Sequence, residues 1–249
     1  MLEIAANSVA SALAAQDGGA GRVELCTALE LGGLTPSHAQ IALVRERLRI
    51  PLYVLIRPRA GDFLYSDLEC EAMQRDIETC VALGCDGVVL GMLDADGKVD
   101  VPRCRTLIGA AGALGITFHR AFDLSHDPSR ALEDIIALGC ERVLTSGAQP
   151  SAVEGAALIR TLVAQAGDRL TVMPGAGITA ANIAALAEAT GAHEFHASAK
   201  QLRPSRMHHR LARLHDMQGG ELRTDAEQVR AMARALCSFL CAHGEAGRG

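Results

Sequence analysis

A repeating unit of helix, glycine and short strand constrains the fold of this chain more than any other sequence feature. In each copy, a stretch rich in Ala and Leu is followed by a glycine and then by a short strand with β-branched residues. Each glycine lies where a helix should end in a left-handed turn, a conformation that glycine adopts without steric cost. The copies occupy residues 18–26, 83–91, 138–147 and 190–199.

Four further strands are expected between these copies, which makes eight in all. They are predicted at residues 2–6, 51–57, 115–120 and 170–175. The segments between strands place apolar residues three and four apart, as amphipathic helices do. Strands that alternate with helices pair in parallel, and eight such units close a (β/α)8 TIM barrel. An open doubly wound sheet is the rival fold, but no G-x-G-x-x-G motif follows the first strand.

Several element boundaries follow from the same patterns. Helices are predicted over residues 67–83 and 151–166, and helix starts at Asp127-Pro128 and at Thr179. The length of 249 residues fits one barrel domain that takes up the whole chain, residues 1–249. After the eighth strand the periodicity is lost over residues 200–223, which are expected to form either a lid over the site or a surface loop. A terminal helix is expected at about residues 225–242.

Charge and hydropathy exclude several classes of function. A net charge of −5 predicts no general affinity for nucleic acid or for an anionic membrane. No apolar run approaches the roughly 18–20 residues of a membrane span, and the first residues lack a signal core, so a cytoplasmic location is expected. The eight cysteines include no C-x-x-C pair, and we expect them to be reduced and to act as small hydrophobes.

Polar residues gather at the predicted strand ends, where barrels of this kind carry their functional side chains. Alternation along the fifth strand places His119 and Arg120 on opposite faces. Polar groups inside a barrel are tolerated near its open mouth, where water or a ligand satisfies them. For any one of these residues the alternative is a buried structural ion network. The candidate catalytic residues are Glu24, Arg57, His119 and Asp123.

Residues 174–179 (PGAGIT) predict an anion-binding site after the seventh strand. The glycines let the backbone approach a ligand closely, and the N-terminal amides of the following helix would point towards it. The loops after strands seven and eight are the usual phosphate site in these barrels. A tight turn without a ligand is the alternative. The candidate anion-binding residues are Arg59, Ser146, Gly175, Ala176, Gly177, His196 and Ser198.

Cys26 is the candidate metal ligand, because it is the cysteine placed at the carboxyl end of a predicted strand. Cu(I) prefers two or three thiolate or thioether ligands. Cys237 and Cys241 lie four residues apart in the terminal helix, and residues 207–209 (MHH) offer mixed donors. Packing of the helix and a solvated loop explain these two groups at least as well as metal binding does.

Several of these runs resemble the CutC family of copper homeostasis proteins. The runs are ELC (24–26), GGLTPS (32–37), IRPRAGDFLYSD (56–67), TFHRAFD (117–123), RVLTSG (142–147), PGAGI (174–178) and EFHASA (194–199). The resemblance extends from residue 2 to about residue 210, with the runs in the same order. It implies a cytoplasmic (β/α)8 barrel, often a homo-oligomer, with a proposed role in copper handling.

The chain departs from the family pattern in its first strand. Family members commonly begin with Glu-Val-Cys-Val-Asp-Ser, whereas Ala5 and Asn7 stand here in place of the cysteine and the acid. Cys26 remains, but one thiolate is a poor Cu(I) site. Two functions therefore stay open: a copper homeostasis protein that binds copper weakly through Cys26, and an enzyme acting on a small anionic or phosphorylated metabolite. A barrel that serves only as a binding scaffold is a third.

Overall fold

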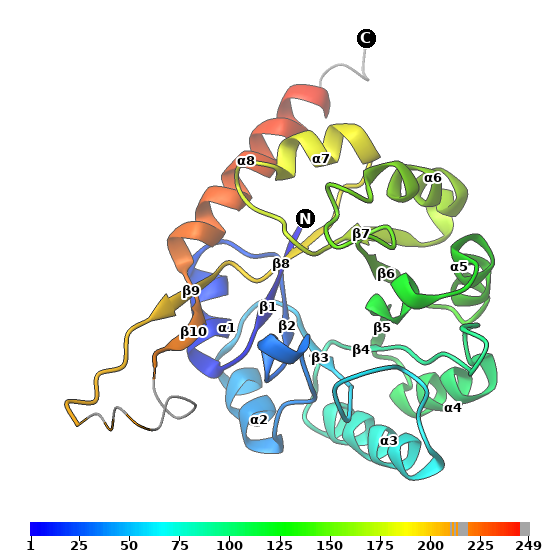
Figure 1. Cartoon of the computed structure of the whole chain (residues 1–249), viewed down its shortest axis with the longest axis horizontal. Coiled ribbons are helices and arrows are strands. Elements are labelled where there is room, and N and C mark those ends of the chain that lie inside the picture. Colours follow the sequence, from blue (N-terminus) through cyan, green and yellow to red (C-terminus); the bar gives the residue numbers. More distant parts are fainter. Residues whose placement is uncertain (210, 212, 214–218, 245–249) are drawn as a thin grey trace.

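A computed structural model describes residues 1–209, 211, 213 and 219–244 of the chain. Eight parallel strands are hydrogen-bonded in the order β7-β6-β5-β4-β3-β2-β1-β8, and β7 and β8 lie side by side to complete the ring (Figure 1). The predicted (β/α)8 barrel is therefore confirmed. The strands are β1 (Leu2–Ala6), β2 (Arg22–Leu25), β3 (Leu52–Leu55), β4 (Gly87–Leu90), β5 (Gly115–Phe118), β6 (Arg142–Thr145), β7 (Thr171–Pro174) and β8 (Phe195–Ala197).

Helices surround the strands on the outside of the ring (Figure 1). They are α1 (Val9–Asp17), α2 (His38–Arg47), α3 (Asp67–Ala82), α4 (Val101–Ala111), α5 (Pro128–Ala137), α6 (Ala156–Ala166), α7 (Ile183–Thr190) and the terminal α8 (Ala226–Gly244). Short 3-10 turns occur at η1 (Leu29–Leu31), η2 (Arg120–Leu124) and η3 (Gly167–Arg169). Within the described part of the chain, no helix combines the length and the apolar character that crossing a bilayer requires.

The glycines of the repeating unit behave as predicted. Gly19, Gly84, Gly139 and Gly191 have φ angles of 90°, 69°, 79° and 74° and end or follow helices in the left-handed region. Asp127 begins α5, because its carboxylate accepts a hydrogen bond of 3.0 Å from the backbone N–H three residues later. These local signals fixed helix ends well because each depends on one residue and its own backbone.

Two predicted helix starts are wrong. Helix α7 begins at Ile183 and not at Thr179, because the Asn182 side chain accepts from the Thr179 N–H and holds residues 179–182 in a turn. Helix α6 begins at residue 156 and not at 151. Gly155 packs so tightly against the loop after β6 that a Cβ there would lie 1.9 Å from a backbone oxygen, which keeps the preceding residues in turns.

Residues 200–223, expected to be irregular, contain an antiparallel hairpin of β9 (Lys200–Arg203) and β10 (Glu221–Thr224). β9 is exposed along its length, and exposure along β10 falls from Glu221 to the buried Thr224 without alternating, so no two-residue pattern marks these strands and the hairpin was missed. In Figure 1, β9 and β10 project sideways from the barrel and do not cross the centre of the ring. The described part therefore favours the surface-loop alternative over a lid. Residues 210, 212 and 214–218 of this prediction lie outside the described residues.

The barrel has two separate interiors. Between the strands and the helices lies an apolar core, to which the strands contribute fully buried side chains such as Ile4 and Phe118. Inside the ring, a small apolar cluster is built around Tyr53, which is paired in register with Gly87, itself paired with Gly115. A Cβ on Gly87 would lie 2.2 Å from the Tyr53 ring, and one on Gly115 would lie 2.1 Å from the Tyr53 hydroxyl. The tyrosine ring therefore takes the space that the two glycines leave open.

We predict that Gly87→Ala lowers the free energy of unfolding by about 1–3 kcal/mol, because the new methyl group overpacks the ring interior against Tyr53. Gly109→Ala is the matched control, since nothing lies within 4 Å of a Cβ there and its φ is ordinary. The control should stabilise α4 by about 0.5–1 kcal/mol. Urea denaturation followed by circular dichroism measures both changes. Equal effects of the two substitutions would contradict the packing described here.

Candidate functional site

A cavity of about 690 Å³ opens at the carboxyl end of the strands, with walls formed by the strand ends and the loops that follow them. Its existence there agrees with the prediction that polar strand ends converge on one rim. Predicted site residues in its wall are Glu24, Cys26, Arg57, His119, Asp123, Ala176, Gly177, His196 and Ser198. The remaining three, Arg59, Ser146 and Gly175, are not part of the wall.

Glu3 lies beneath the cavity and was missed by the sequence analysis. Register places it beside Arg22 on β2 and beside His196 on β8. One carboxylate oxygen accepts from Arg22 Nε, and the other lies 2.7 Å from His196 Nδ1. Burial alone would raise the pKa of Glu3, but the hydrogen bond with His196 and the charge of Arg22 outweigh it and lower the pKa to about 2. The signal that could have found Glu3 is a single acid in an otherwise apolar strand.

A network of charges continues from Glu3 towards the amino end of the barrel. Arg22 and Arg142 each donate to Glu194 at 2.9 Å, and Arg142 also bonds Glu141 at 2.7 Å. Both guanidinium groups lie over the Tyr53 ring, at 5.0 and 5.3 Å from its centroid. The floor of the cavity is therefore a set of alternating charges rather than the branched apolar layers usual in such barrels.

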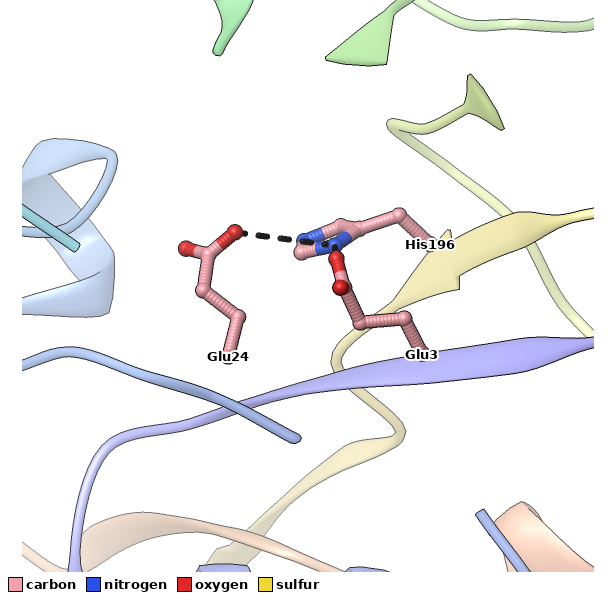
Figure 2. Close-up of side chains that lie close together, drawn as sticks. All are labelled: Glu3, Glu24 and His196. Atoms are coloured by element: carbon pink, nitrogen blue, oxygen red, sulfur yellow. Dashed lines mark hydrogen bonds and ion pairs between the residues drawn. The ribbon is translucent and has the colours of Figure 1, made fainter. Parts of the chain in front are cut away.

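Glu24 faces the cavity from the end of β2, with its side chain almost fully buried. Its Oε2 has no hydrogen-bond partner among the described residues, and the nearest cationic atom is His196 Nδ1 at 3.8 Å (Figure 2). Burial raises the pKa of Glu24 to about 7; the negative charge of Glu3 adds to the rise, and His196 and Arg22 oppose it. A carboxylate with that pKa is an effective proton acceptor at neutral pH.

His119 lies in the cavity wall at the end of β5, and its protonation follows from one hydrogen bond. Its Nδ1 accepts from the backbone N–H of Ala121 at 3.2 Å, so the proton of the neutral ring is on Nε2. Burial and the nearby charge of Arg57 lower the pKa of His119 to about 3. Nε2 is buried and has no partner among the described residues. His119 therefore offers a neutral N–H donor to whatever occupies the cavity.

Arg57 lies in the cavity wall, but most of its donors already have partners. Its Nη1 donates to the carbonyls of Leu31 and Gly33 at 2.8 and 2.9 Å, and its Nη2 donates to the carbonyl of Gly61 at 3.0 Å. The guanidinium also lies 5.0 Å from the centroid of the Phe63 ring. Nη1 and Nη2 thus fasten the loop after β2 to the loop after β3, whereas the buried Nε has no partner among the described residues.

Asp123 likewise holds loops together. Its carboxylate accepts from Thr145 Oγ1 at 2.5 Å and from the backbone N–H of Ser146 at 3.0 Å, and it pairs with Arg120 Nε at 2.7 Å. Arg120 lines the cavity although alternation placed it on the opposite face from His119. The strand ends at residue 118 and the 3-10 turn η2 begins at residue 120, so strand alternation does not extend that far.

Three predicted anion-binding residues take no part in the cavity wall. Arg59 pairs with Asp62 at 2.9 Å and Glu69 at 2.6 Å outside the cavity. Ser146 is fully buried and donates to the carbonyl of Gln149 at 2.6 Å. Gly175 directly follows β7, and a Cβ there would lie 2.5 Å from the Leu144 side chain.

Four loops at the cavity end of the barrel carry an alanine in the left-handed region. These loops follow β2, β6, β7 and β8, and the alanines are Ala28, Ala148, Ala176 and Ala199, with φ angles of 48°, 54°, 77° and 45°. Other non-glycine residues of the described chain avoid this region. Such strained backbone persists where the surroundings over-determine it, which is common around ligand sites.

Cys26 lies apart from the cluster of possible metal donors that the described residues contain. Its thiol is fully buried and lies 3.7 Å from the carbonyl of Ala6, and burial raises the pKa of the thiol well above its usual range. Among the described residues, the one group of at least three His, Cys, Asp or Glu donors that lie within 4.8 Å of one another is Glu3, Glu24 and His196, without Cys26. In that group both Glu3 oxygens are already engaged and Arg22 supplies the positive charge.

Sequence comparison now identifies the family. The CutC family model matches residues 1–201. The chain belongs to the CutC family. A family protein CutC from Xanthomonas campestris pv. campestris (strain B100) is 61% identical over 235 residues, which cover 94% of this chain and 98% of the relative. A mouse protein named copper homeostasis protein cutC homolog is 50% identical over 207 residues, which cover 83% of this chain and 76% of the relative.

Solved structures agree with this membership. The crystal structure of the putative copper homeostasis protein CutC from Streptococcus agalactiae superposes with a TM-score of 0.76 at 33% identity, covering 79% of this chain and 97% of that one. Thiamine phosphate pyrophosphorylase from Pyrococcus furiosus superposes with a TM-score of 0.61 at 14% identity, covering 96% of both chains, and shows the shared fold alone. In this CutC family member, Ala5 pairs with Glu24 and brings a methyl group to the cavity wall.

We predict that Glu24→Gln stabilises the protein at pH 8 and not at pH 4. The carboxyl has a pKa near 7 in the folded state against an ordinary value of 4.5, so it holds its proton more tightly when folded. The stability this contributes is complete below about pH 4.5 and is lost as the pH rises through 7. The glutamine does not ionise, so its advantage should grow to the order of 1–3 kcal/mol at pH 8.

Thermal melts from pH 4 to 8 measure this difference. Glu78→Gln, on the exposed face of α3, is the control and should follow the parent protein at every pH. A constant difference between Glu24→Gln and the parent across the range would show that the buried carboxylate is not the cause.

Proposed function

We propose that this CutC family protein is an enzyme that moves a proton at a carbon atom next to a carbonyl group in a small anionic metabolite. The observation that carries the proposal is the pairing of two unsatisfied groups in one cavity. Glu24 presents a carboxylate oxygen without a hydrogen-bond partner, and His119 presents a neutral N–H without an acceptor. A glutamate base combined with a neutral histidine donor is an established arrangement for enolisation.

The chemistry needs no further group. Glu24 Oε2 takes the proton from the carbon, and the electron pair of the broken C–H bond forms a carbon–carbon double bond as the carbonyl oxygen becomes negative. The His119 Nε2–H stabilises that oxygen by a hydrogen bond. The protonated Glu24 then returns the proton to the same carbon as the carbonyl group re-forms, which regenerates the carboxylate. Because His119 is neutral, it stabilises the oxygen without fully protonating it.

The rim of the cavity favours an anionic substrate. Lys200 is exposed at the start of β9, and Arg120 is about half exposed; both lie in the wall. Ala176, Gly177 and Ser198 lie in the loops that commonly bind phosphate in these barrels. We therefore propose that the negative group of the substrate is held at this rim, while its carbonyl group reaches down to His119.

The mouse relative is named for copper homeostasis. We propose that such a role acts through the metabolite that the enzyme converts, and not through a copper ion bound at Cys26. We further propose the cytoplasm as the location, which the eight unpaired cysteines support. A homo-oligomer and the absence of nucleic-acid partners stay predictions.

We predict that the protein exchanges a carbon-bound proton of a suitable probe for deuterium. A panel of three- to five-carbon hydroxyaldehydes and hydroxyketones, each with and without a phosphate group, is incubated in D2O, and loss of the proton signal is followed by NMR. Glu24→Gln should slow the exchange by at least about 100-fold, because it removes the base. His119→Gln should slow it less, and Glu78→Gln should not change it. Absence of exchange across the panel, or exchange that survives Glu24→Gln, would contradict the proposal.

We also predict that Cys26 does not take up Cu(I) stoichiometrically. The reduced protein is titrated with Cu(I) in competition with a coloured chelator, and Cys26→Ala should give the same curve as the parent. Double replacement of the exposed Cys237 and Cys241 by Ala controls for surface thiols. Uptake of one equivalent by the parent that only Cys26→Ala abolishes would restore the copper-binding alternative.

A further inference from the structure

We infer that Glu3 and His196 form a buried carboxylate–imidazolium pair whose positive charge beside Glu24 favours the ionised form of that catalytic base. The role of Glu24 as a catalytic base rests on the proposed function. The arrangement of Glu3, His196 and Glu24 rests on their geometry. His196 Nδ1 lies 2.7 Å from Glu3 Oε1 and 3.8 Å from Glu24 Oε2. The three side chains come from β1, β2 and β8 and point towards one another (Figure 2).

The pair is fixed from below. Arg22 donates to the second oxygen of Glu3 and is itself held by Glu194 at 2.9 Å, so the Glu3 carboxylate has no freedom to turn. His196 therefore presents one edge to Glu3 and keeps a fixed distance from Glu24.

The charges around Glu24 determine how strongly it holds a proton, and the Glu3–His196 pair contributes to that balance. The charged groups that face it are Glu3, Arg22 and His196. Burial and the negative charge of Glu3 both favour the protonated form of Glu24, which cannot accept a proton from a substrate. A positive imidazolium about 4 Å away favours the carboxylate and offsets them. His196 can hold that charge because Glu24 and Glu3 raise its pKa above the usual value, although burial opposes them.

His196 is a positioning residue in this account, not a proton donor to the substrate. Its Nδ1 is occupied by Glu3 and its assigned role is the charge it places near Glu24, whereas His119 supplies the buried donor without a partner. Replacement of His196 by Asn separates its hydrogen bond to Glu3 from its positive charge. An Asn amide can keep a hydrogen bond to Glu3 from near the Nδ1 position, but it cannot carry a positive charge.

The test measures Glu24 directly, with no substrate present. The protein is labelled with ¹³C at glutamate side-chain carboxyls, the Glu24 signal is assigned by its loss in Glu24→Gln, and its titration is followed by NMR. We expect the Glu24 pKa in His196→Asn to be higher than in the parent by about 1 or more, the effect of losing an opposite charge at this distance. If a probe of the panel shows proton exchange, the exchange rate should rise with pH as Glu24 ionises. In His196→Asn that rise should occur at a pH that is higher by the same amount.

Glu194→Gln is the matched control, because it removes a charge from the same network and the same strand end without contacting Glu24. It should lower the melting temperature but leave the Glu24 titration nearly unchanged. An unchanged Glu24 pKa in folded His196→Asn would overturn the inference. If that variant does not fold, ¹⁵N NMR of His196 in the parent decides: an imidazolium at pH 6 supports the pair, and a neutral ring overturns it.

The outcome separates this inference from the proposed function. A Glu24 pKa that responds to His196→Asn, combined with no exchange in any probe, would leave the pair standing and reject the enolisation chemistry. Titration with Zn²⁺ tests the remaining alternative, which is that the three side chains bind a metal ion. One equivalent bound by the parent and lost in both Glu3→Gln and His196→Asn would show that the three side chains are metal ligands and would overturn the inference.

Discussion

The bond between Glu3 and its two partners is the interaction on which the rest of the barrel interior depends. A carboxylate with no solvent exposure is costly unless it is paired and fully hydrogen-bonded. Arg22 and His196 satisfy one oxygen each, and both are placed by strand register rather than by a loop. Because β1 lies between β2 and β8, this one side chain ties the first strands of the chain to the last. Loss of either partner would leave a buried charge unpaired.

Burial also explains how two acid–base groups of one cavity acquire complementary states. Low solvent exposure disfavours the charged form of any group. It therefore raises the pKa of Glu24 to about 7 and lowers that of His119 to about 3. The carboxyl titrates close to neutral pH while the imidazole stays neutral, so one can accept a proton while the other donates a hydrogen bond. The local charges of Glu3 and Arg57 act in the same directions as burial.

The sequence predicted the fold far better than the details of the site. Alternating strands and glycine-terminated helices are local patterns, so eight parallel strands and a polar rim followed from them. Arg57 and Asp123 were correctly placed near the rim, but their partners are backbone groups of distant loops, which no spacing in the sequence encodes. Glu3 was missed because it lies in the interior one layer below the rim. Only the register of three strands shows that it supports Glu24.

Two buried acid–base groups without a partner and the strained loop backbone lie at the cavity end of the barrel, and their coincidence is the strongest argument for a ligand. Charges on the amino side are joined into a network through Arg22, Glu194 and Arg142. On the carboxyl side, Glu24 Oε2 and His119 Nε2 have no partner within the described chain, although buried polar atoms normally find one. The left-handed alanines lie in the loops of that same end. A fold that served only as a scaffold would gain nothing from leaving a buried carboxylate oxygen and a buried imidazole nitrogen without partners in the wall of one cavity.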